Sequence, residues 1–113
     1  MAVLPLFRVA VAGDSMAPTM RDGEWWVARR TGSVGVGDVV VIDHPEYPGL
    51  LAVKRIVRAE GDGWWVEGDN PQRSRDSRHF GPVPAARILG RVVLRYRPLP
   101  PVGPPRAASP VRD

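Results

Sequence analysis

The chain has 113 residues, of which 43% are hydrophobic and 25% are charged, and this composition predicts one small globular domain. It contains no cysteine, which excludes disulfide bonds and thiolate metal sites. The formal net charge of +4 raises the question of nucleic-acid binding. Because most arginines are interleaved with acidic residues, we favour a solvated basic surface and expect no nucleic-acid partner.

The N-terminal stretch 1–7 is apolar, but Pro5 interrupts it and Arg8 ends it. It is far shorter than the ~20 residues that a membrane-spanning helix needs. No basic segment precedes it, as a secretory signal peptide would require. We therefore expect a cytoplasmic protein without a membrane anchor of its own.

Short apolar segments alternate with turns marked by Gly, Pro and Asp along most of the chain. The expected strands are 6–12, 25–29, 38–42, 50–60, 64–67 and 87–96. The glycines of the loop 31–37 do not match a phosphate-binding spacing, so we predict no nucleotide site. Six of the 13 prolines fall in the segment 98–113, which we expect to be an extended or disordered tail. The chain therefore predicts a mostly β domain over 1–97 and a Pro-rich tail.

Ser15 lies in a stretch of small residues, 12–20, that is unsuited to a long regular element. Gly13 and Pro18 predict a tight turn at the end of the first strand. A serine hydroxyl in such a turn becomes an effective nucleophile only when a base activates it. The candidate bases are His44, His79 and Lys54.

Lys54 is the most informative of these candidates, because it is the only lysine among sixteen basic residues. A guanidinium does not give up its proton in a protein, whereas a buried amine does. Strand alternation places Lys54 on the same face as Ala52 and Ile56, and burial there would lower its pKa. The alternative is an exposed lysine on an edge strand. We predict that Lys54 is buried and serves as the base for Ser15.

Four segments resemble the successive conserved boxes of type I signal peptidases, in the same order. They are 13–19 (GDSMAPT), 37–41 (GDVVV), 53–57 (VKRIV) and 68–84 (GDNPQRSRDSRHFGPVP). The resemblance implies the mostly β fold that signal peptidases share with self-cleaving repressor peptidases, here without a membrane anchor, and a Ser/Lys dyad. Such repressors also need a DNA-binding domain and a cleavage loop, for which we expect this chain to be too short.

The resemblance also implies a role for each matching residue. Ser15 would attack the scissile carbonyl, its backbone N–H would stabilise the oxyanion, and Lys54 would accept the proton. Ser74 would orient the lysine amine, and Asp76 and Arg78 would brace the loop. The turn and the substrate groove would be shaped by Gly13, Met16 and Pro18.

Three departures from the signal peptidase pattern qualify this expectation. Gly13 stands where some members have a serine that supplies a second oxyanion donor. Pro71 and Arg73 replace the Arg and Asn that are usual in the last box. The membrane-associating insertions of signal peptidases are absent.

Within the superfamily, the compact boxes and the run 63–71 (GWWVEGDNP) resemble the nickel-type superoxide dismutase maturation proteases. This resemblance implies an endopeptidase that removes the N-terminal propeptide of a dismutase precursor. The nickel would belong to that substrate, so we expect no cofactor and no metal site, and we interpret His44 and His79 as loop residues.

Two alternatives remain open. One is signal-peptidase-like processing of another precursor. The other is an inactive module of the same fold that binds peptide or nucleic acid through its Arg and Trp residues. The four tryptophans form two adjacent pairs, and we expect one of each pair in the core and the other on the surface or a groove wall. They are Trp25, Trp26, Trp64 and Trp65.

Overall fold

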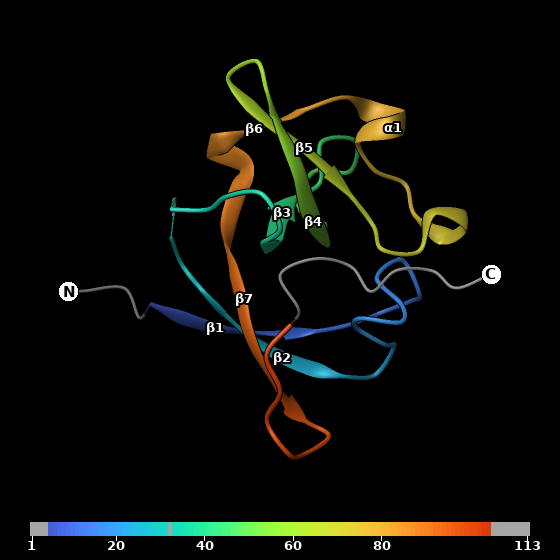
Figure 1. Ribbon diagram of the computed structural model, residues 1–113, viewed down its shortest axis with the longest axis vertical. Coiled ribbons are helices and arrows are strands. Elements are labelled where there is room, and N and C mark those ends of the chain that lie inside the picture. Colours follow the sequence, from blue (N-terminus) through green and yellow to red (C-terminus); the bar gives the residue numbers. More distant parts are fainter. Residues whose placement is uncertain (1–4, 32, 105–113) are drawn as a thin grey trace.

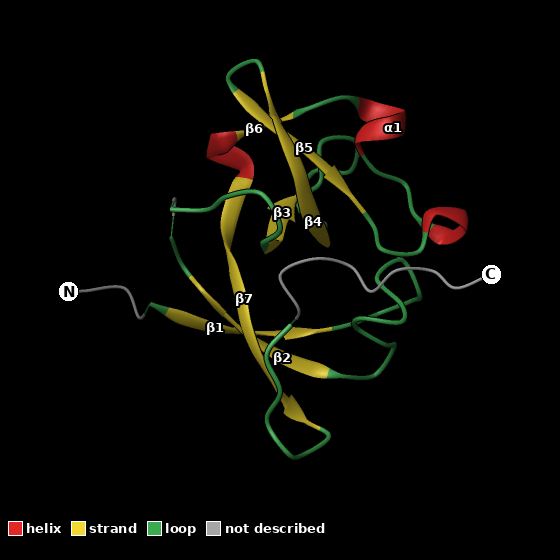
Figure 2. Ribbon diagram, in the orientation of Figure 1, coloured by secondary structure: helices red, strands yellow, loops and turns green. Residues whose placement is uncertain are grey.

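The computed structural model describes residues 5–31 and 33–104. Strands dominate this part of the chain, and the helical segments are short (Figure 2). The strands are β1 (Leu6–Ala10), β2 (Trp25–Arg29), β3 (Val39–Asp43), β4 (Leu51–Glu60), β5 (Gly63–Glu67), β6 (Val83–Pro84) and β7 (Ile88–Arg97). The helical segments are η1 (Pro71–Arg73), α1 (Ser77–Phe80) and η2 (Ala85–Arg87). The mostly β fold predicted from the sequence is confirmed.

The described strands form one antiparallel sheet in the order β1-β2-β7-β3-β4-β5-β6. In Figure 1, β7 runs between the β1–β2 end of the sheet and the end that holds β4, β5 and β6. β1 is an edge strand that pairs only with β2. The first half of β4 pairs with β3, and pairing with β5 begins at Arg55. Among the described residues, both β1 and the first residues of β4 therefore keep one edge without a strand partner.

The core consists of two clusters, and β3 contributes to both. Val39 and Val41 pack in a cluster with Trp26, whereas Val40 and Ile42 pack in a second cluster with Ile56. Because successive side chains of a strand point to opposite faces, this strand is buried on both sides. The uninterrupted apolar run predicted a buried strand here, and that prediction is confirmed.

The expected strands are all present, with ends that shift by one or two residues. The segment 68–84 lies between two of the expected strands, and no regular element was predicted there, but it contains η1, α1 and the two-residue strand β6. Asp76 caps α1: its side chain accepts a hydrogen bond from the backbone of Arg78, and its backbone N–H bonds to His79. A capping residue at the start of a single helical turn is too short a signal to predict a helix.

The chain turns back after β7, and Val102 pairs with Arg95 through backbone hydrogen bonds. Residues 105–113, most of the predicted tail, lie outside the described residues. The boundary at residue 97 and the disorder of the tail stay predictions. In the described part of the chain, no helix has the length and apolar character needed to cross a membrane.

Candidate active site

Ser15 lies in a compact turn between β1 and β2, as the small residues predicted. The turn is closed by backbone hydrogen bonds from Ala17 to Asp14 and from Met20 to Met16. Gly13 has a φ of 85°, a conformation that favours glycine, and its N–H donates to Asp22 Oδ1 at 2.7 Å. Two buried methionines, 16 and 20, anchor the turn in the core. The Ser15 side chain itself is half-buried.

A groove of about 340 Å³ passes beside Ser15. One wall is the segment 8–12 and the other is the segment 50–53, at the beginning of β4. Apart from Arg8 and Ser15, the lining residues are apolar. Met16 also lines this groove, whereas Pro18 lines a different cavity beside Asn70 and Pro71. The groove is long enough along β1 to hold several residues of an extended chain.

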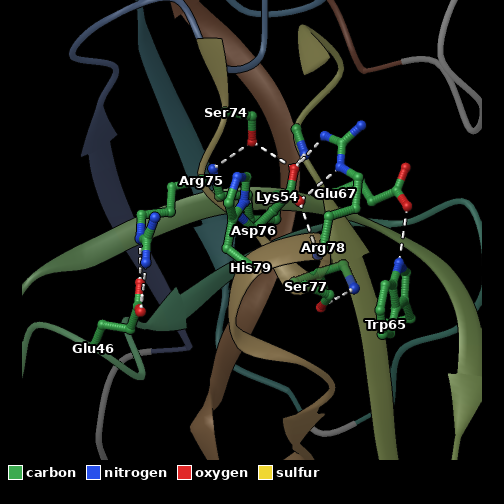
Figure 3. A network of polar contacts seen from close by, with 12 residues as sticks. Glu46, Lys54, Trp65, Glu67, Ser74, Arg75, Asp76, Ser77, Arg78 and His79 are labelled. Carbon is green, nitrogen blue, oxygen red and sulfur yellow. Dashed lines mark hydrogen bonds and ion pairs between the residues drawn. The ribbon is translucent and has the colours of Figure 1, made fainter. Parts of the chain in front are cut away.

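Lys54 is buried on β4, with only 4% of its surface exposed. Its face is the predicted one, because Ala52 and Ile56 pack in the same cluster. The amine donates a hydrogen bond to Ser74 Oγ at 3.1 Å (Figure 3). Burial lowers the pKa of Lys54, the negative charge of Asp76 opposes this shift, and the positive charge of Arg78 adds to it. The predicted burial and lowered pKa are both found.

Asp76 is fully buried, and its carboxylate accepts a hydrogen bond of 2.7 Å from the Ser74 hydroxyl. Its carboxylate also accepts a hydrogen bond from the Gly68 backbone N–H at 2.9 Å. The Arg78 guanidinium donates to the same carboxylate (Figure 3). Burial alone would raise the pKa of Asp76, but these donors hold it well below its usual range. The carboxylate is therefore charged at neutral pH.

This charge fixes the direction of the hydrogen bonds around Ser74. A serine hydroxyl has one proton, and the Asp76 carboxylate accepts only. Ser74 must therefore donate its hydrogen bond to Asp76, and a lone pair of Ser74 Oγ accepts the hydrogen bond from the Lys54 amine. A neutral amine that donates here keeps its own lone pair free for another proton.

The segment Gly68–Asn70 joins the serine turn to the lysine side of the site. The Asn70 backbone N–H donates to the carbonyl of Ser15 at 2.9 Å, and its side-chain amide donates to the carbonyl of Asp14 at 3.1 Å. A Cβ at Gly68 would collide with both the Ser74 side chain and the Ser15 carbonyl. Within the described residues the Ser15 hydroxyl has no hydrogen-bond partner, so it is not yet engaged with an acceptor.

A second buried network was not singled out from the sequence. Arg55 forms two hydrogen bonds of 2.9 Å to the Asp69 carboxylate and a third of 2.8 Å to the carbonyl of Gly37. Asp69 also accepts the hydroxyl of Thr19, at the end of the serine turn. This network therefore ties the serine turn to the strand that carries Lys54. Its residues stand inside the segments that resemble signal peptidase boxes, which was the available signal.

Neither histidine forms a hydrogen bond to Lys54 or Ser74 in the described residues. His44 follows β3, where its ring contacts Tyr47 and Phe80, and burial lowers its pKa. His79 lies in α1 rather than in a loop, and it belongs to the cap formed with Asp76. No cluster of metal-ligating side chains is found in the described ranges.

In the antiparallel β fold, the Ser15 carbonyl and the Ser74 side chain both lie close to Gly68. The buried Lys54 is hydrogen-bonded to Ser74. This arrangement fits a serine peptidase of the signal peptidase I type, and comparisons with known proteins support that class. The chain belongs to the Peptidase S24-like family, whose model matches residues 4–93.

Several similar proteins are proteases of mitochondria or chloroplasts. The chain is 35% identical to mitochondrial inner membrane protease subunit 1 of Xenopus tropicalis, over 85% of this chain and 72% of the relative. It is 36% identical to mitochondrial ATP-independent inner membrane protease subunit 1a of Arabidopsis thaliana, over 78% and 68%. It is 29% identical to thylakoidal processing peptidase 1 of the same plant, over 82% and 44%. The chain is thus a signal-peptidase-like serine protease that acts on precursor proteins.

These relatives correct one expectation. The chain was predicted to be cytoplasmic because its N-terminal apolar stretch is short. The similar proteases are named for the mitochondrial inner membrane, which points to that membrane rather than to the cytoplasm. A short apolar stretch was therefore an unsound basis for a prediction of compartment.

Proposed function

We propose that the protein is an endopeptidase in which Ser15 is the nucleophile and Lys54 the general base. The observation that carries this proposal is the only lysine of the chain, buried on β4 and hydrogen-bonded to Ser74. Burial favours the neutral amine, which is the form that accepts a proton. The Ser15 hydroxyl has no hydrogen-bond acceptor within the described residues, and catalytic hydrogen bonds often form or tighten only when substrate binds.

The reaction would proceed in two balanced steps. Ser15 Oγ adds to the scissile carbonyl while its proton passes to Lys54 Nζ, and the ammonium then returns this proton to the leaving amine. Water then adds to the acyl ester and gives its proton to Lys54, the ester C–O bond breaks, and the ammonium returns the proton to Ser15 Oγ. The products are two peptides, one with a new carboxylate and the other with a new amine.

Two features support stabilisation of the oxyanion by the Ser15 backbone N–H. Asn70 holds the Ser15 carbonyl by a hydrogen bond of 2.9 Å, which fixes the backbone on one side of the residue. The Ser15 N–H itself has no hydrogen-bond partner in the part of the chain that is described. Gly13 supplies no side-chain donor, so we expect this backbone group to carry the stabilisation.

The groove supports an extended peptide as substrate. Among the described strands, β1 has a free outer edge, and the residues of β4 before Arg55 pair with β3 only. A peptide that adds to such edges gains main-chain hydrogen bonds, while side-chain pockets provide specificity. The apolar walls favour small or apolar side chains next to the scissile bond.

As a particular client we propose the precursor of a nickel superoxide dismutase, from which the protein would remove the N-terminal propeptide. The resemblance of the run 63–71 to the maturation proteases supports this client. The relatives named above are organelle proteases, and their names carry no nickel dismutase. The competing proposal is therefore another precursor protein.

Intact-mass spectrometry of a nickel dismutase precursor after incubation with the protein tests both the proposed chemistry and the proposed client. A single cut that frees the propeptide, and that Ser15→Ala abolishes, is the expected result. Cleavage of a mixed peptide library, but not of this precursor, would reject the client and keep the chemistry. A folded wild-type protein that cuts neither would support an inactive peptide-binding module.

A further inference from the structure

A second cavity shares Arg8 with the groove beside Ser15, and we call it the Arg–Trp cavity. It has a volume of about 310 Å³ and is lined by Arg8, Trp25, Tyr96 and Arg97. Trp26 is buried in the core, whereas its neighbour Trp25 is 38% exposed and lines this cavity. The expectation that one tryptophan of this pair is core and the other a groove wall is confirmed. The proposed reaction does not require the exposed one.

The cavity combines flat aromatic surfaces with positive charge. The rings of Trp25 and Tyr96 lie 6.4 Å apart, centroid to centroid, and the Arg8 guanidinium lies 5.9 Å from the Trp25 ring. Arg97 pairs with Trp25 across β7 and β2. The aromatic wall restricts the arginine and reduces its hydration, which prepares it for an anion.

The two arginines of this cavity differ from other arginines of the sheet in their pairing. Within residues 5–31 and 33–104, Arg8 and Arg97 have no carboxylate partner. Other arginines of the sheet are paired, for example Arg95 with Glu24 and Arg58 with Glu60. Two unpaired guanidinium groups beside a cavity would attract a carboxylate, whose two oxygens match their planar donors.

Arg8 also connects this cavity to the groove beside Ser15. Arg8 lines both the cavity and the groove. It is the first residue of the 8–12 wall, and the serine turn follows the other end of that wall. Four residue steps separate Arg8 from Ala12, or roughly 13 Å along an extended strand. A peptide that lies along β1 with its scissile bond at Ser15 would therefore bring a residue about four to six positions away to Arg8.

We propose that the Arg–Trp cavity is a specificity site for an acidic side chain of the precursor, about four to six residues from the scissile bond. The inference rests on the proposed function, because that function places the peptide in the groove. The positive charges of the cavity would also attract a nucleic acid or a lipid headgroup. We favour a peptide as the ligand because the cavity is continuous with the groove through Arg8.

The first test measures binding, so that it does not depend on cleavage. Fluorescein-labelled alanine–valine peptides are prepared in pairs that differ at one position, Glu in one and Gln in the other, and this position is scanned along the peptide. Their affinities for the Ser15→Ala protein are measured by fluorescence anisotropy at low ionic strength. At one stretch of positions the Glu peptide should bind about threefold to tenfold more tightly. High salt should remove this preference.

Three variants locate the effect. Arg8→Gln should abolish the preference for Glu, and Arg97→Gln should reduce it. Arg58→Gln is the matched control, because it removes the same charge from an arginine that also lies on a tryptophan, Trp65, at 4.3 Å. This control should keep the full preference.

Cleavage of the same peptides by the wild-type protein separates the two proposals. A Glu preference in binding without any cleavage would reject the proposed peptidase and support the cavity. Cleavage that is indifferent to Glu at every scanned position would overturn the cavity. A preference that survives both Arg8→Gln and Arg97→Gln would also overturn it. A third contrary result would be equal affinities for the Glu and Gln peptides, combined with binding to phosphatidylglycerol vesicles or oligothymidine that depends on Arg8. This result would overturn the proposal and assign the cavity to a lipid headgroup or a nucleic acid.

Discussion

Lys54 Nζ donates a hydrogen bond of 3.1 Å to Ser74 Oγ, although the two residues are 20 positions apart in the chain. Ser74 in turn donates to Asp76, whose charge is secured by Arg78 and by the backbone of Gly68. The amine is thus positioned by a hydroxyl whose direction is fixed. Burial at the same time lowers the pKa of the Lys54 amine and so favours its neutral form. Ser74 positions the amine, whereas burial is the main cause of its lowered pKa, so variants that change one or the other should differ in effect.

Lys54→Arg should nearly abolish peptide cleavage, because the guanidinium keeps the charge and cannot accept a proton.

For the wild-type protein, the neutral amine is the active form, so kcat/KM should rise with pH through the pKa of Lys54. This pKa is lowered by burial, and the rise should lie below the usual lysine range of about 10.4. The measurement is kcat/KM for a cleaved peptide across the pH range. An active Arg variant, or a rate that is flat with pH, would exclude Lys54 as the base.

Asp76→Asn should destabilise the fold by about 3 kcal/mol at neutral pH, because it leaves the buried donors Ser74 Oγ and Gly68 N–H, and the partly exposed Arg78, without their charged acceptor. The pKa of Asp76 is lower in the folded than in the unfolded state. Its contribution to stability is therefore present above the unfolded-state value of about 3.9 and is lost as the pH falls below it. Urea unfolding at neutral and acidic pH should show a smaller pH dependence for Asp76→Asn than for the wild-type protein. Equal pH dependences would contradict this role.

Gly68→Ala should strongly reduce both activity and thermal stability. The added methyl group collides with the Ser74 side chain and with the carbonyl of Ser15, so one of them must move. Gly35→Ala is the matched control, since a Cβ there meets nothing within 4 Å. Peptide cleavage and thermal unfolding of both variants are the measurements. A Gly68→Ala protein with the activity of the control would show that this close approach is unimportant.

Thr19→Val should lower kcat with a small effect on the folded fraction. The substitution removes the hydrogen bond from the serine turn to Asp69 and keeps the side-chain volume. A lost hydrogen bond to a charged group corresponds to about 1.5–3 kcal/mol, or roughly ten- to a hundredfold if all of it appears in the rate. Thr31→Val, whose hydroxyl accepts only an exposed local hydrogen bond from Ser33, is the control. Equal rates for the two variants would rule out a positioning role for Thr19.

Local patterns were sufficient to predict the strands and the burial of Lys54. Period-two alternation placed Lys54 on the face of Ala52 and Ile56, and the unbroken apolar run of β3 favoured a buried strand. The helical turn at Ser77–Phe80 was missed because it depends on one cap, formed by Asp76. The Arg55–Asp69–Thr19 network was missed because its partners are distant in sequence, and pairing of charged residues across a fold leaves no periodic signal. The compartment was predicted wrongly because an apolar stretch that is too short to span a bilayer says nothing about the membrane near which a protein works.

The proposed chemistry depends above all on the protonation state of Lys54, and the sequence makes this state directly measurable. Because the chain has one lysine, ¹⁵N-lysine labelling gives one side-chain amine signal, without assignment by mutagenesis. The NMR titration of this signal in the folded protein is the measurement. We predict a midpoint clearly below about 10.4 that coincides with the midpoint of the pH–rate profile. A Lys54 amine that titrates at or above the usual lysine value in the folded protein would contradict its role as the base.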